Sequence, residues 1–136
     1  MADNFQDMYE ELISNLYSQS VNKDLGPYSQ YKNYLVSPDG TFLGKLTRNK
    51  YDSLGIFNPY GTHGSRYSSH SITNPYSNYG SKYSTYSPYN PYAQNPPEIY
   101  LNNKLSGRLT VNKYLNNATS PEALFKRILT ESQFAY

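Results

Sequence analysis

Basic residues stand beside tyrosines at regular intervals in the middle of the sequence. Three such pairs recur every 16 residues: Lys50-Tyr51, Arg66-Tyr67 and Lys82-Tyr83. A cation beside an aromatic ring can neutralise a phosphate while the ring stacks on a base, as in single-stranded nucleic-acid binding. The same pairing also arises when a cation merely lies over its neighbouring ring. We favour this packing interpretation, because eight basic residues spread over residues 40–118 are a low charge density for a nucleic-acid groove.

Tyrosine is the other residue type with binding potential, at 17 of 136 positions. Exposed rings offer contact area at low entropy cost, which suits a protein partner or sugar rings. We expect about half of the rings to form the core in place of scarce aliphatic residues. The candidate binding residues are Tyr60, Arg66, Tyr67, Tyr76, Tyr79, Lys82, Tyr83, Tyr86, Tyr89 and Tyr92.

Residues suited to catalysis or metal binding are sparse. His63 and His70 are the two histidines, and cysteine is absent. Between Gly40 and Ala118 the two carboxylates, Asp52 and Glu98, lie far apart in the sequence. A metal site needs three or four ligands, and acid–base catalysis needs paired groups. We therefore predict no catalytic residue, no metal site, no cofactor and no enzymatic activity.

The 16-residue interval also governs an Asn-Pro-Tyr motif, which begins at Asn58, Asn74 and Asn90. A proline at every sixteenth position cannot donate to a strand ladder, so long strands are excluded there. Asn-Pro favours turns. The alternative is a disordered Ser- and Tyr-rich tract. The strict period favours ordered turns over residues 52–97.

A duplicated octamer flanks these turns. Residues 44–51 read GKLTRNKY and residues 107–114 read GRLTVNKY. Each copy follows two short apolar segments separated by turn residues, Asp39-Gly40 in the first and Asn102-Asn103 in the second. The pattern predicts two related β-hairpins, at residues 33–51 and 98–114.

Amphipathic helices are predicted at both ends of the chain. Residues 1–22 carry an apolar stripe from Phe5 to Tyr17 and four acidic residues without a basic one. At the other end, Ser120 is placed as N-cap and Pro121 as first helical residue of a helix within residues 119–136. The buried face of this second helix is predicted to contain Leu124, Phe125, Ile128 and Leu129, with Phe134 continuing it.

These elements predict an α+β fold in three parts. The parts are an acidic N-terminal helix at 1–22, a repeat domain at 33–118 and a C-terminal helix at 119–136. In the repeat domain the hairpins form a small antiparallel sheet, bridged by the tyrosine-rich turns. No stretch of the sequence approaches the roughly 20 apolar residues that a membrane span needs.

The motifs resemble a family of short bacterial tandem-repeat proteins. The resemblance rests on residues 42–47 (FLGKLT), 49–53 (NKYDS) and 58–61 (NPYG), which match units of the form LGKLS-x-N-x-YD, SNPYGxYGSxYS and SxxNPY. It spans about residues 34–114. The family is largely uncharacterised, and many of its members look exported. This chain has an acidic helix where a signal peptide would stand, which favours the cytoplasm, whereas the resemblance implies an exported or envelope-associated protein.

Three functions remain open. The first is a non-catalytic scaffold whose tyrosine-rich surface binds another protein or a second copy of the chain. The second is a single-stranded nucleic-acid binder, and the third is a cell-envelope or polysaccharide binder. Salt separates the second from the others, because phosphate-driven binding weakens steeply as salt rises.

Overall fold

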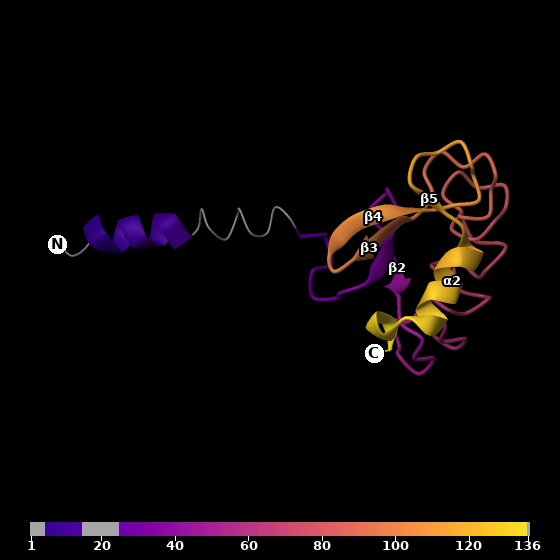
Figure 1. Cartoon of the computed structure of the whole chain (residues 1–136), viewed down its shortest axis with the longest axis horizontal. Helices are drawn as coiled ribbons and strands as arrows, with labels where there is room; N and C mark the ends of the chain where they lie inside the picture. Colours follow the sequence, from indigo (N-terminus) through magenta and orange to yellow (C-terminus); the bar gives the residue numbers. More distant parts are fainter. Residues whose placement is uncertain (1–4, 15–24, 136) are drawn as a thin grey trace.

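The computed structural model describes residues 5–14 and 25–135, and it shows the predicted α+β class (Figure 1). One sheet contains five strands in the order β2-β1-β3-β4-β5. The strands are β1 Tyr34–Val36, β2 Phe42–Lys45, β3 Glu98–Leu101, β4 Lys104–Leu109 and β5 Ala118–Thr119. The prediction of a purely antiparallel sheet is wrong, because β5 pairs with β4 in the parallel direction. After β4 the chain turns back, so that Ala118 of β5 pairs with Arg108 of β4. The two strands therefore run in the same direction.

Strands distant in the sequence meet at the centre of the sheet. β1 pairs antiparallel with β2, and β3 pairs antiparallel with β4. The connection from β3 to β4 passes through Asn102 and Asn103, both at positive φ (52° and 62°), the backbone that a tight two-residue turn needs. β1 and β3 also pair with each other, and the rings of Tyr34 and Tyr100 stack there at 5.1 Å. This pairing holds the two ends of the turn-rich segment side by side.

The C-terminal helix covers the sheet. α2 (Pro121–Thr130) begins where the sequence predicts, with the Ser120 side chain accepting a hydrogen bond from the Ala123 N–H. Leu124 and Ile128 of α2 are fully buried, together with Phe134 of the short 3₁₀ helix η1 (Ser132–Phe134). Leu129 was predicted to be buried but is 59% exposed. The buried side chains of α2 are Pro121, Leu124 and Ile128, and Leu129 lies on a different face of the helix.

Between the two ends of the sheet lies the turn array, which we define as residues 49–95. Its chain advances in three-residue turns that begin at a Ser, Asn, Asp or Gly. In the second unit the side-chain oxygens of Ser65, Ser68, Ser71, Asn74 and Ser77 each accept a hydrogen bond from the N–H two residues later. Backbone bonds such as Ser77 N–H to Asn74 O close the same turns. The second unit therefore contains five Asx or Ser turns and one additional residue, whereas in the first unit the turns that begin at Gly55 and Gly61 are closed by backbone bonds alone.

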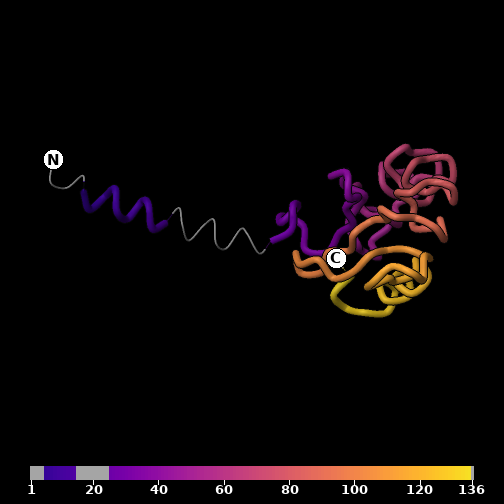
Figure 2. The backbone as a smooth tube through the Cα atoms, turned by 90° about the horizontal axis from the view of Figure 1, so that it is seen from above, coloured from indigo at the N-terminus to yellow at the C-terminus, as the bar shows by residue number. Residues whose placement is uncertain are grey.

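The additional residue is glycine where one unit passes to the next. A Cβ atom on Gly64 would lie 2.1 Å from the Asn58 carbonyl oxygen, and one on Gly80 would lie 2.1 Å from the Asn74 carbonyl oxygen. Both obstacles are backbone atoms, which no side-chain rearrangement can relieve. These glycines allow the chain to pass close to the Asn-Pro-Tyr turn of its own unit as it continues into the next one. Figure 2 shows the path of the backbone through the turn array.

The described part of the N-terminal segment, residues 5–14, is helical. Its large apolar side chains are all exposed: Phe5, Met8, Tyr9, Leu12 and Ile13. The remainder of the helix predicted over residues 1–22 lies outside the described residues.

Candidate functional site

Side chains at equivalent turn positions line up across the units of the turn array. The Asn-Pro-Tyr tyrosines are almost fully exposed, at 96% for Tyr60, 93% for Tyr76 and 76% for Tyr92. The inward positions are occupied by Ile56, which is 2% exposed, and Ile72, which is 1% exposed. The 16-residue period thus sorts the array into inward and outward columns.

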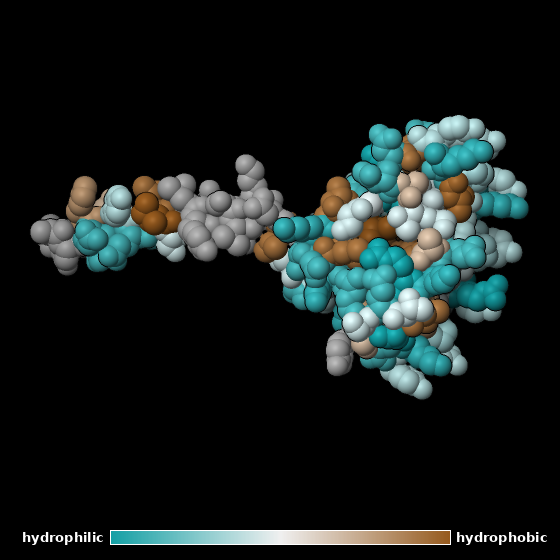
Figure 3. All heavy atoms as spheres, in the orientation of Figure 1, coloured by the Kyte–Doolittle hydropathy of each residue, from teal (hydrophilic) through white to brown (hydrophobic). Residues whose placement is uncertain are grey.

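A groove of about 1050 Å³, here called the turn groove, lies between two of these columns. We define its floor as the less exposed lining residues, which include Ile56, Ile72 and the third-turn residues Phe57, Thr73 and Tyr89. The exposed lining residues form its walls: Pro59, Pro75, Tyr76, Arg66, Lys82 and Tyr83. In the space-filling view the turn-array side of the molecule is mostly pale and teal, with brown apolar patches between (Figure 3).

The turn groove is positively charged. Arg66 and Lys82 are its charged lining residues, and neither is paired with a carboxylate within the described ranges. Asp52, the one acid of the turn array, is bonded to Lys45 at 2.6 Å. Lys82 Nζ lies 5.4 Å from the centre of the Tyr83 ring, so the predicted cation packing occurs at this pair. The groove therefore combines aromatic and proline surface with two uncompensated cations.

Five of the ten candidate binding residues line the turn groove: Arg66, Tyr76, Lys82, Tyr83 and Tyr89. Tyr60, Tyr67 and Tyr92 are exposed but lie outside it. Sequence reasoning missed Phe57, Thr73 and the two prolines of the walls. Alignment by three-residue turns would have found them, because Phe57, Thr73 and Tyr89 hold the same position in successive units.

The two remaining candidates point inward and support the fold. Tyr79 is 9% exposed, so little of its ring is open to a binding partner. Its hydroxyl donates to Oδ2 of Asp39 at 2.7 Å and lies 3.0 Å from Oγ1 of Thr41, so it joins the turn array to the β1–β2 turn. Burial raises the pKa of Tyr79, which keeps the hydroxyl protonated for that bond. Tyr86 is half-buried and packs beside Tyr79 at 6.4 Å.

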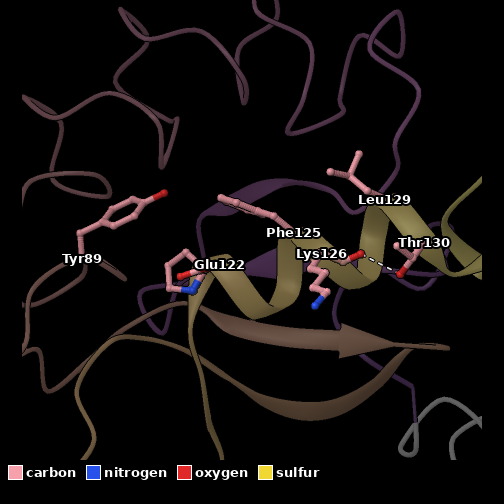
Figure 4. Close-up of a pocket in the computed structure, with 7 residues that line it drawn as sticks. Tyr89, Glu122, Phe125, Lys126, Leu129 and Thr130 are labelled. Atoms are coloured by element: carbon pink, nitrogen blue, oxygen red, sulfur yellow. Dashed lines mark hydrogen bonds between the residues drawn. The ribbon is translucent and has the colours of Figure 1, made fainter.

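A second hollow of about 600 Å³ adjoins α2 (Figure 4). Tyr89 lines both this hollow and the turn groove, and its ring points from the turn array toward Phe125 (Figure 4). Phe125 in turn meets Phe57 of the groove floor edge-to-face at 5.5 Å. Burial raises the pKa of Tyr89, so its hydroxyl stays a neutral donor between the two hollows.

The histidines serve structure in this region. His63 is 7% exposed; its Nδ1–H donates to the His70 carbonyl at 3.1 Å, and its ring meets Phe42 edge-to-face at 5.0 Å. Burial lowers the pKa of His63, because a charged imidazolium would lose its hydration there. Within residues 5–14 and 25–135, no three histidine, aspartate or glutamate side chains gather to hold a metal ion.

Comparison with protein-family models, with curated proteins and with solved structures finds no match to this chain. The resemblance of its motifs to bacterial tandem-repeat proteins therefore stays a prediction. Among the helices that the structure describes, none has the length and apolar character to cross a membrane.

Proposed function

We propose that the chain is a non-catalytic binding module whose turn groove holds a segment of a protein. The observation that carries this proposal is the groove itself, which is lined by four aromatic rings and two prolines together with Ile56 and Ile72. Aromatic and proline surfaces bind peptide segments well, because rigid rings lose little entropy when they are covered. Arg66 and Lys82 in its walls favour a segment with acidic residues.

Single-stranded nucleic acid is the second candidate, supported by the presence of Arg66, Lys82 and Tyr83 in the walls. The floor and the low charge favour protein. Residues 49–95 carry three basic residues and one acid, a net charge of +2. A groove that follows a phosphate backbone needs more cations than this.

Two tyrosines of the same motif provide a matched test. Tyr76 lines the turn groove, whereas Tyr60 holds the equivalent position one unit earlier and does not. Each is replaced, one at a time, by a photo-crosslinking benzophenone amino acid in the native host. We expect protein adducts from position 76 and few from position 60, because only the first faces the groove.

The adducts also separate the two candidates. Adducts that survive nuclease and a high-salt wash support a protein segment. Adducts that nuclease removes support nucleic acid and overturn the proposal. Equal labelling from both positions, or none from either, would show that the groove is not the binding surface.

A further inference from the structure

The helix at residues 5–14 presents an apolar stripe that no described residue covers. Phe5 is 78% exposed, Met8 67%, and Leu12 56%, and Tyr9 and Ile13 complete the stripe at helical spacing. Figure 3 shows hydrophobic atoms open to solvent along this helix. An amphipathic helix gains most of its stability by packing this face against another surface. The stripe therefore needs a partner.

The borders of the stripe are acidic. At about 100° per residue, Glu11 lies on one border and Glu10 on the other, whereas Asp7 lies on the face opposite the stripe. Residues 5–14 contain these three acids and no basic residue, which gives a net charge of −3. The turn groove carries the opposite charge, because Arg66 and Lys82 are among its lining residues. Like the helix stripe, it also has apolar surface, in its floor. Helices of this type bind grooves of this type through the apolar face, while the charges set the orientation.

The position at which the chain joins the fold favours the groove of another copy. The Gly26 N–H donates to the Asn103 carbonyl at 2.7 Å, so the chain joins the sheet beside the β3–β4 turn. That turn lies at the end of the sheet away from the turn array (Figures 1 and 2). The described chain thus enters the folded region at the end opposite the turn groove, an arrangement suited to contacts between successive copies.

We infer that the turn groove binds the N-terminal helix of a second copy of this chain. This inference rests on the proposed function and names the occupant of the same groove. The apolar stripe of residues 5–14 lies on the floor around Phe57 and Tyr89. Glu10 and Glu11, on the two borders of the stripe, lie close to Arg66 and Lys82. Because each copy carries one helix and one groove, the contact is head-to-tail and extends to further copies.

The test is sedimentation velocity of the purified full chain over a concentration series. Two double charge reversals are compared, Glu10→Lys/Glu11→Lys in the helix and Arg66→Glu/Lys82→Glu in the groove. Each places like charges across the contact, and we expect each to weaken self-association about tenfold or more. The control Lys104→Glu/Lys113→Glu changes net charge equally at exposed residues outside the groove, and we expect wild-type association.

Mixing the two reversed proteins distinguishes a second copy from the same chain. The lysine-bearing helix of one protein complements the glutamate-bearing groove of the other, so we expect association to return on mixing. If the helix instead folds back onto its own groove, wild type stays monomeric throughout the series, and the inference is overturned. Association that neither reversal weakens more than the control does would also overturn it.

Photo-crosslinking from position 76 distinguishes failure of this inference from failure of the proposed function. In a mixture of isotopically light and heavy copies, we expect adducts that join position 76 of one copy to residues 5–14 of the other. Adducts to a different protein, with a monomeric purified chain, would overturn the inference and leave the proposed function standing. Absence of any adduct at the groove would overturn both.

Discussion

In the sheet, the backbone N–H groups of β1 and β3 bond to carbonyls of neighbouring strands, whereas in the turn array many bond to side-chain oxygens two residues earlier. Asn74 shows the second arrangement most fully. Its Oδ1 accepts from the Tyr76 N–H at 3.0 Å, and its Nδ2 donates to the Ser68 carbonyl at 2.9 Å. A strand keeps its ladder when a side chain changes, but a turn of this kind does not. The turn array should therefore be far more sensitive than the sheet to small substitutions.

Glycine substitutions should give the largest contrast between the two regions. We expect Gly80→Ala to destabilise the fold by about 3 kcal/mol or more, because its Cβ would meet the Asn74 carbonyl at 2.1 Å. In Gly40→Ala, in the β1–β2 turn, the added Cβ would have no atom within 4 Å. We expect this variant to lose only about 1–2 kcal/mol of stability, from the strain of its positive φ of 91°. Urea denaturation of both variants measures the difference. An equal or smaller loss at Gly80 would contradict the close approach of this residue to the Asn74 carbonyl.

The next effect concerns the turn-forming side chains. Asn74→Ala leaves a backbone N–H and a carbonyl without partners, and we expect a loss of about 2–3 kcal/mol. Asn74→Asp keeps the acceptor for Tyr76 and should lose less. In the sheet, Ser106→Ala removes the bond to the Lys104 carbonyl but leaves the ladder intact, so we expect less than about 0.5 kcal/mol. Similar losses for Asn74→Ala and Ser106→Ala would remove the distinction between the regions.

Acid should weaken the contact between the turn array and β2. The pKa of His63 is lower in the folded chain because of burial, so the unfolded chain takes up the proton first. The stability that neutral His63 contributes is complete above about pH 6.5 and is lost as the pH falls through that value toward the folded pKa. We expect the dependence of the unfolding free energy on pH to disappear over this range in His63→Tyr. Tyrosine is chosen because Tyr79 holds the equivalent position in the next unit. The exposed control His70→Gln should keep the pH dependence, and an unchanged pH dependence in His63→Tyr would assign it to another group.

Substitutions of the outward-facing tyrosines should have almost no effect on the stability of the fold. Tyr60→Ser and Tyr76→Ser remove rings that are more than nine-tenths exposed, and we expect changes within about 0.5 kcal/mol in thermal unfolding. Tyr76→Ser should nevertheless reduce self-association through the turn groove, whereas Tyr60→Ser should not. A large loss of stability in Tyr76→Ser would mean that its ring supports the fold.

Features that depend on residues close in the chain could be predicted from the sequence, whereas features that depend on distant contacts could not. The start of α2 could be predicted because Ser120 and Pro121 act within one turn of the helix. The exposure of Leu129 could not, because the side of a helix that is buried depends on what it meets. Tyr79 and Tyr76 carry the same residue type three positions apart, yet one reaches Asp39 and the other faces solvent. Residue type alone could not separate them.

The sequence by itself determined the α+β class and the 16-residue interval that orders the side chains of the turn array. Both follow from interactions between residues close in the chain, since proline, asparagine and serine act on backbone groups within a few positions. Only the tertiary structure decided that β5 runs parallel to β4 and that Phe57, Tyr76 and Lys82 surround one groove. These features depend on which distant surfaces pack together, and burial of apolar area is non-directional, so short-range patterns leave that choice open.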